Sequence, residues 1–200
     1  TLKENLTNIN LEPLKTNLSL ALVNINEELT QTKHSKNSIP QIIDPKFSKD
    51  EDISQCMSDD DDVVVVSIGE LTKLYPIKIL QQHLIVNDKI GDQSILVSYC
   101  GLCDTIKVFK REVNGEVDNF GTTGILYKNN DLMYDYKTET LWTQYSGEAL
   151  VGERFGKLLE SIPSRIIKYS YAKSEYAENE IMIFDTGFRM DYNDKSFDEF

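Results

Sequence analysis

The chain has few cysteines, few basic residues and no long apolar run, and each shortage excludes a class of protein. Three cysteines in 200 residues are too few for a disulfide-rich scaffold, and the odd number leaves at least one unpaired or in an unusual role. Only 21 basic residues stand against 33 acidic ones, a formal net charge of −12, which argues against nucleic acid and anionic membranes as partners. No run reaches the roughly 18 apolar residues of a membrane-spanning helix, so we expect no integral membrane segment.

Several well-known functional motifs are also missing. The sequence has no Gly-x-Ser-x-Gly elbow, no phosphate-binding P-loop and no Gly-x-Gly-x-x-Gly fingerprint. The first exposes a nucleophilic serine, and the other two bind phosphate groups through backbone N–H groups. Serine-hydrolase, nucleotide-driven and Rossmann-type functions therefore have no support. With 40% hydrophobic residues, the chain is instead typical of a globular protein with one buried core.

The first part of the chain has the pattern of an amphipathic helix. Apolar residues recur at three- and four-residue steps from Leu14 to Leu29, and Pro13 suits the first turn of a helix. Ile39-Pro40 then favours an extended backbone, because the residue before proline is pushed out of the helical region. We therefore predict an N-terminal helix or linker over residues 1–38 and one domain over residues 39–200.

The rest of the chain is rich in patterns typical of strands. Residues 63–68 form a largely β-branched run, and Asn114-Gly115 suits a type I′ hairpin turn, whose central residues need positive φ. Pro76 begins a predicted helix over residues 77–84, and Asn87-Asp88 predicts a bend. Further strands are predicted over residues 71–75, 94–99, 132–136, 141–145, 165–171 and 181–184. We expect an α+β, β-rich fold: a single domain of mostly antiparallel strands and hairpins with few helices.

The residues best suited to catalysis or metal binding lie in one stretch, residues 75–103. It contains the chain's one Cys-x-x-Cys, formed by Cys100 and Cys103, one of its two histidines, His83, and the Asn87-Asp88 pair. The apolar segment 94–99 directly precedes Cys100, which places the thiols at the end of a predicted strand. If the protein has a chemical site, we expect it here.

In one interpretation these residues bind a transition metal ion. Cys100 and Cys103 would supply two soft ligands, His83 a third, and Asp88 or a water molecule the fourth. Two thiolates and an imidazole suit zinc, copper or iron. Because the chain has no second Cys-x-x-Cys and no His-x-x-x-His, an open site with three protein ligands fits better than a closed structural site.

Other interpretations of the cysteines need no metal. The two thiols could cycle through a disulfide, although they follow a strand, whereas a helix N-terminus or a nearby cation usually stabilises a reactive thiolate. They could form a structural disulfide in a non-catalytic extracytoplasmic binding domain, with an aromatic surface around Trp142 and Tyr145. Both cysteines and His83 could also simply be packed in the core. The sequence leaves these alternatives open.

Two carboxylates near the single tryptophan suggest a weaker alternative, a hydrolase. Asp135 and Glu148 could do general acid–base work if they faced one cleft, as in glycoside hydrolysis. Asp135 precedes a predicted turn, however, where a carboxylate normally accepts hydrogen bonds from backbone N–H groups. A structural role is therefore favoured for Asp135, and Glu148 is the stronger candidate of the two.

The order of motifs along the chain resembles the DUF3179 domain family. The matching segments are IPQIIDPKF (39–47), LYPIKIL (74–80) with the following His83, IVND (85–88), VSYCGLC (97–103), VFKREVNG (108–115), FGTTGIL (120–126), NNDLMYDYKTETLWTQYSGEALVG (129–152) and DTGFRMDY (185–192). The family usually has proline after the first cysteine, where this chain has Gly101, but both thiols are kept. The resemblance implies a homologous domain and no particular reaction or ligand. Because members often look exported, it favours an extracytoplasmic location, exported or lipid-anchored.

Overall fold

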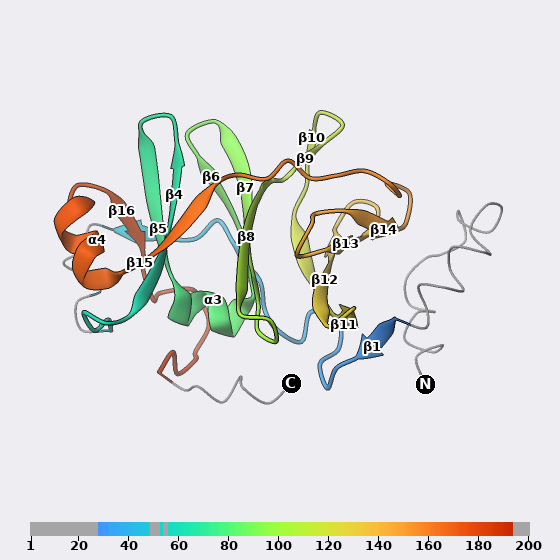
Figure 1. Ribbon diagram of the computed structural model, residues 1–200, viewed down its shortest axis with the longest axis horizontal. Coiled ribbons are helices and arrows are strands. Elements are labelled where there is room, and N and C mark those ends of the chain that lie inside the picture. The colour runs from blue at the N-terminus through green and yellow to red at the C-terminus, as the bar shows by residue number, and fades with distance from the viewer. Residues whose placement is uncertain (1–27, 49–52, 54–55, 194–200) are drawn as a thin grey trace.

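The computed structural model describes residues 28–48, 53 and 56–193, and Figure 1 shows their arrangement. The helix expected from Leu14 to Leu29 lies almost entirely outside the described residues. Its last position, Leu29, instead begins a strand, β1 (Leu29–Gln31). In the part of the chain that the structure describes, no helix is long and apolar enough to cross a membrane.

The described residues form three sheets and a small hairpin, with the central sheet between the other two in Figure 1. The first sheet has the strand order β15 (Ser164–Lys168), β4 (Asp62–Ile68), β5 (Leu71–Pro76), β16 (Glu180–Met182) and β3 (Phe47–Ser48). The central sheet has the order β2 (Ile42–Ile43), β6 (Ile85–Ile90), β7 (Gln93–Cys100) and β8 (Thr105–Lys110). The third sheet has the order β1, β11 (Phe120–Tyr127), β12 (Asn130–Asp135), β13 (Leu141–Thr143) and β14 (Ala149–Val151). The hairpin pairs β9 (Glu112–Val113) with β10 (Glu116–Val117).

These pairings confirm the predicted β-rich α+β fold. Most neighbouring strands are antiparallel, and β16 with β5 and β2 with β6 are the parallel pairs of the described residues. Helix α3 (Ile77–His83) directly follows Pro76, as predicted, because proline has the backbone angle that a helix start requires. Asn114 and Gly115 have the positive φ angles, 54° and 81°, of the predicted hairpin turn.

The prediction of a bend at Asn87-Asp88 is wrong, because both residues lie in strand β6. Asn87 is fully buried, and its side chain pairs with the backbone of Phe120 in the third sheet. The Asn87 amide donates to the Phe120 carbonyl oxygen at 2.9 Å, and the Phe120 N–H donates to the Asn87 amide oxygen at 2.8 Å. This tertiary contact outweighs the low strand propensity of asparagine.

The predicted strand over residues 165–171 is also partly wrong. Strand β15 ends at Lys168, and helix α4 (Tyr169–Glu175) follows it. Tyr169 and Ala172 are three positions apart, so they lie on one face of the helix. Both are buried there against Ile53 and Val63 in one apolar cluster. Burial of this face decides the local structure.

The central sheet is buried on both faces, which fixes the position of the cysteines. An apolar cluster on one face includes Val97 of β7 together with residues of the first sheet and α3. A second cluster on the other face includes Leu96 of β7, with Phe120 and Trp142 of the third sheet. Side chains alternate along a strand, so Ser98 and Cys100 lie on the same face as Leu96 and point toward the third sheet.

Candidate functional site

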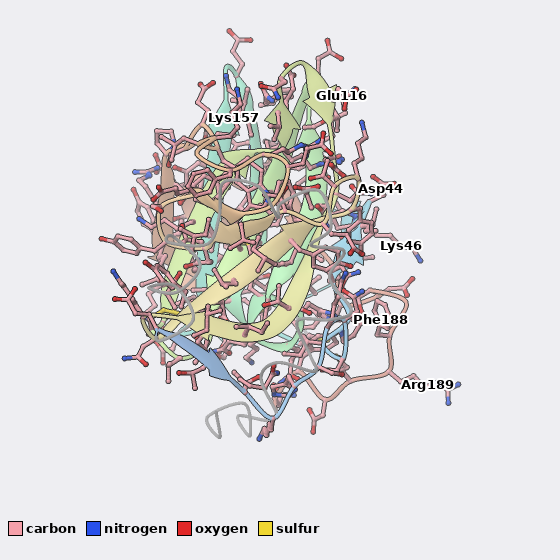
Figure 2. All side chains as sticks on the ribbon, turned by 90° about the vertical axis from the view of Figure 1, so that its right-hand side faces the viewer. Asp44, Lys46, Glu116, Lys157, Phe188 and Arg189 are labelled. Atoms are coloured by element: carbon pink, nitrogen blue, oxygen red, sulfur yellow. A yellow bond between two sulfur atoms is a disulfide. The ribbon has the colours of Figure 1, made fainter. Side chains whose placement is uncertain are left out.

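Cys100 and Cys103 form a disulfide at the end of β7, drawn as a yellow bond in Figure 2. Their Cα atoms are 5.5 Å apart, within the usual range for a disulfide. Cys100 is fully buried, whereas Cys103 is half-buried and the intervening Leu102 is 46% exposed. The two sulfurs therefore belong to residues with different access to solvent. The third cysteine, Cys56, is exposed and not in a disulfide.

Two side chains donate hydrogen bonds to the Cys103 sulfur. The Asn130 side-chain amide lies 3.1 Å from Sγ, and the Thr105 hydroxyl lies 3.5 Å from it. The same two groups lie 3.1 Å and 3.3 Å from Oε1 of Gln144, so the three side chains form one polar cluster. Such donors stabilise negative charge on the Cys103 sulfur whenever it is a thiolate.

The polar cluster (Thr105, Asn130 and Gln144) is held rigidly by the backbone. Gln144 is fully buried, and its Nε2 donates to the carbonyl oxygens of Ser98 and Thr105 at 3.3 and 3.2 Å. Asn130 accepts a hydrogen bond from the Tyr145 N–H at 2.9 Å. The oxygen and nitrogen of each amide are therefore assigned by their partners.

A tight turn puts Asn130 in this position. Lys128 and Asn129 both have positive φ, 51° and 61°, and connect the paired residues Tyr127 and Asn130 of β11 and β12. A two-residue turn of this kind matches the twist of the strands it joins. Asn130 is thereby the first residue of β12, beside the cysteines.

Asp131, the next residue of β12, lies under the Cys-x-x-Cys turn. Its carboxylate accepts a hydrogen bond from the backbone of Gly101. Burial is the larger influence and raises the pKa of Asp131 to about 7, while the Gly101 bond acts in the opposite direction. The second carboxylate oxygen, Oδ2, is buried and has no hydrogen-bond partner within the described part of the chain.

Asp131 also lines a small cavity of about 20 Å³ between β7 and the third sheet. The residues that line it include Ser98, Tyr99, Gln144, Leu84 and Met133. A cavity of this size has room for one water molecule.

His83 is fully buried and both of its ring nitrogens have hydrogen-bond partners. Nδ1 lies 2.6 Å from the Pro40 carbonyl oxygen, and Nε2 lies 2.8 Å from the Tyr192 hydroxyl. Nδ1 must therefore donate to the carbonyl oxygen, whereas the Tyr192 hydroxyl can either donate to Nε2 or accept from it. Burial, the larger cause, lowers the pKa of His83 and favours the neutral form. The ring of Phe188 packs against the His83 ring, with the two ring centroids 5.4 Å apart. Figure 2 labels Phe188 near the edge of the molecule.

Asp88 is also bound to residues other than the cysteines. Its carboxylate lies 3.0 Å from the Lys73 ammonium and 2.7 Å from the Tyr75 hydroxyl. In the described ranges, no group of three or more His, Cys, Asp or Glu side chains could hold a metal ion. The metal site made of Cys100, Cys103, His83 and Asp88 stays a prediction.

The two hydrolase candidates lie in different environments. Asp135 is fully buried and accepts hydrogen bonds from Trp142 Nε1 at 2.8 Å and the Thr138 N–H at 2.7 Å. Glu148 is exposed, and its backbone N–H donates to the hydroxyl of Thr143 at 3.2 Å. The hydrolase with Glu148 and Asp135 stays a prediction too.

Trp142 cannot contribute to the aromatic binding surface that one of the alternatives placed around Trp142 and Tyr145. The side chain is fully buried, and its ring packs edge-on against Phe120 with centroids 5.9 Å apart. Tyr145, in contrast, is 62% exposed and lies under the Lys107 ammonium, 4.6 Å from its ring centroid.

Sequence reasoning identified the cysteines of this site but not the residues around them. Thr105 lies in β8, Asn130 and Asp131 lie in β12, and Gln144 follows β13, so no spacing pattern links them to Cys103. The one available signal was their common position at strand ends, which is shared by many polar residues.

Comparison with known proteins gives one match. No curated protein matches the chain, and no solved structure does. The family model described as "Protein of unknown function (DUF3179)" matches residues 36–200, which is most of the chain and includes both cysteines and the polar cluster. The chain therefore belongs to the DUF3179 family.

Proposed function

We propose that Cys100 and Cys103 form a redox-active disulfide that exchanges electrons with a thiol-containing partner. The observation that carries this proposal is the pair of hydrogen bonds that Asn130 and Thr105 donate to the half-buried Cys103 sulfur. A thiolate is both the nucleophile and the leaving group of thiol–disulfide exchange, so groups that stabilise it favour the reaction.

The difference in burial gives the two sulfurs different roles. A partner thiolate attacks Sγ of Cys103, the Cys100–Cys103 bond breaks, and its electron pair goes to Cys100. The partner is now joined to Cys103 in a mixed disulfide. A second thiol of the partner then attacks the partner's own sulfur and releases Cys103 as a thiolate. Overall, the partner dithiol loses two electrons and two protons, and the cysteine pair gains them.

A purely structural role for this disulfide would bring little stability. Only two residues lie between Cys100 and Cys103, and closing so short a loop constrains the unfolded chain by only about 2 kcal/mol. The β7–β8 pairing already holds both ends, since Cys100 pairs with Thr105 and Ser98 with Lys107. The hairpin therefore has backbone pairing of its own beside the covalent bond.

Unequal reactivity of the two thiols tests the proposal. Both single variants, Cys100→Ser and Cys103→Ser, would be made in a Cys56→Ser background, because Cys56 is exposed and would react as well. A chromogenic aromatic disulfide is then added to the folded proteins. We expect Cys103, in the first variant, to react at least about tenfold faster than Cys100 in the second.

A second measurement separates redox chemistry from the structural alternative. The Cys56→Ser chain would be equilibrated with mixtures of reduced and oxidised dithiothreitol, and its free thiols counted. A cysteine pair that opens and closes in the native fold supports the proposal. If the thiols are released only on unfolding, or if both single variants react equally slowly, the proposal is wrong, and a binding domain with a structural disulfide is favoured.

A further inference from the structure

We propose that Asp131 transfers a proton to the buried Cys100 sulfur when the disulfide opens and takes it back when the disulfide re-forms. This inference rests on the redox role proposed above and assigns the proton donor and acceptor of that same site.

The need for such a group follows from the burial of Cys100. Attack on Cys103 leaves the electron pair on Cys100, whose side chain is fully buried and lies on the face of β7 that points to the third sheet. Burial disfavours the charged form of a thiol. A proton donor inside the protein would therefore stabilise the product as it forms.

Asp131 is placed to be this donor. It enters from the third sheet, the side to which Cys100 points, and its carboxylate contacts the backbone of Gly101, the residue bonded to Cys100. Its neighbour Asn130 contacts the other sulfur. The carboxyl group therefore lies beside the residue that follows Cys100, on the side of β7 to which the Cys100 sulfur points.

The unpartnered oxygen of Asp131 points to a role beyond structure. Buried polar atoms are nearly always hydrogen-bonded, so the lack of a partner for Oδ2 in the described residues calls for an explanation. A carboxyl group that holds its proton in the oxidised protein and gives it up on reduction is such an explanation. The raised pKa of Asp131, about 7, suits a group that must both give and accept a proton near neutral pH.

The cavity beside Asp131 is lined by few other groups that could transfer a proton. His34, from the segment after β1, and Tyr99 of β7 line the same cavity. The Tyr99 hydroxyl donates to the Asp104 carboxylate at 2.9 Å, and burial followed by the charge of Lys33 lowers the pKa of His34. The cavity beside Asp131 has room for one water molecule, which could relay the proton.

The step is balanced as follows. The partner thiolate forms a bond with Cys103 Sγ, the disulfide bond breaks, and its electron pair on Cys100 Sγ takes the proton of the Asp131 carboxyl group. Asp131 is left as a carboxylate and regains a proton from solvent. In the reverse direction, the Asp131 carboxylate removes the proton of Cys100 before that sulfur closes the disulfide.

The experiment measures the rate at which dithiothreitol reduces the disulfide from about pH 5.5 to about pH 9, corrected for the thiolate fraction of the reagent. The proteins are the full chain with Cys56→Ser, the same chain with Asp131→Asn, and a control with Asp104→Asn. Asparagine has the shape of aspartate but no transferable proton. Asp104 is an exposed carboxylate of the same turn, so its variant changes the local charge without touching the buried carboxyl group.

We expect Asp131→Asn to lower the rate about tenfold or more below pH 7, where Asp131 of the parent chain holds its proton. Above about pH 8 the two proteins should react alike, because the parent chain has then lost the same proton. Asp104→Asn should follow the parent profile throughout. An Asp131→Asn profile that matches the parent, or one that Asp104→Asn reproduces, overturns the inference.

A measurement without any variant of Asp131 keeps the inference testable if the variant does not fold. The pKa of Asp131 would be measured by carbon NMR in the oxidised and in the reduced chain. We expect two different values, because the carboxyl group and the Cys100 thiol share a proton in the reduced state. Equal values overturn the inference. A disulfide that dithiothreitol cannot reduce at any pH contradicts the redox function itself, whereas normal exchange with an unchanged pH profile contradicts the Asp131 role alone.

Discussion

Strand β12 carries a carboxylate near each end, and the two differ in burial and in how they are bound. Asp135 accepts hydrogen bonds from Trp142 and Thr138 and lies 3.4 Å from the guanidinium of Arg154, which also binds Asp118 at 2.8 Å. Asp131, four residues earlier, has one backbone donor and one oxygen without a partner in the described chain.

The comparison separates a structural carboxylate from the one that we propose to be reactive. Asp135 is surrounded by donors and a cation, so its charge is compensated and the group fixes the fold. Asp131 is compensated only in part and lies beside the Cys100–Cys103 turn. Both are acidic residues of one short strand, and their burial and their partners distinguish them.

Removal of the cation from the Asp135 cluster should have the largest effect. Arg154→Ala leaves Asp118 and Asp135 buried without their counter-ion, and we expect a loss of about 3–5 kcal/mol in the free energy of unfolding. Urea denaturation measures it. Lys137→Ala serves as the control, because Lys137 forms an exposed ion pair with Glu116 and should cost less than about 1 kcal/mol. Equal losses would contradict the structural role of the cluster.

Substitution of the other carboxylate, Asp131, should raise the free energy of unfolding rather than lower it. The pKa of Asp131 is raised in the folded state, so the folded protein holds a proton that the unfolded chain releases, and stability falls as pH rises from about 4 to about 7. Asp131→Asn removes this dependence. We expect the variant to be more stable than the parent by about 2–4 kcal/mol at pH 8 and about equal at pH 4, in urea titrations at both values. A variant less stable at pH 8 would show that the carboxylate is well compensated.

Loss of the disulfide should change the free energy of unfolding by less than the largest changes expected for Arg154→Ala and Asp131→Asn. Cys100→Ala with Cys103→Ala removes a bond that closes a very short loop, and we expect a loss of about 2 kcal/mol or less, measured by thermal and urea unfolding. Disruption of the fold would indicate that the bond is structural after all.

Removal of one donor to the Cys103 sulfur should change rate rather than stability. Asn130→Ala takes away the hydrogen bond from the side-chain amide, and we expect thiol–disulfide exchange at pH 7 to slow about fivefold to tenfold. Asn119→Ala, remote from the sulfurs and bonded to Arg111, is the matched control. Equal rates for the parent chain and Asn130→Ala would remove the main support for the redox proposal.

Local patterns in the sequence were sufficient to predict much of the fold. The β-branched run before Gly69, the Asn114-Gly115 turn and the Pro76 helix start each depend on the residues involved and their neighbours, so sequence predicts them. Asn87 and the helix after Lys168 were missed because each is decided by a distant contact. Asn87 pairs with Phe120, and Tyr169 packs against residues of β4 and the segment before it.

The candidate site was predictable only in its sulfurs. Cys100 and Cys103 are recognisable from their spacing alone. Asn130, Asp131 and Gln144 reach them through the packing of one sheet on another, and no local rule connects residues that lie about 30 to 40 positions apart. His83 was grouped with the cysteines because it is near in sequence, whereas its partners are Pro40 and Tyr192.

The pairing of Asn87 with the Phe120 backbone has a consequence for how reactivity can vary. The disulfide lies at the end of a strand of the central sheet, whereas two of its polar neighbours, Asn130 and Gln144, lie in or next to strands of the third sheet. The distances between the sulfurs and these side chains therefore depend on how the two sheets are positioned against each other. Asn87 fixes that position through two reciprocal hydrogen bonds, and aspartate of the same size would lose the donor half. Under the proposed function, a substitution at this contact between the two sheets would therefore change the rate of thiol–disulfide exchange, although neither Asn87 nor Phe120 contacts a sulfur.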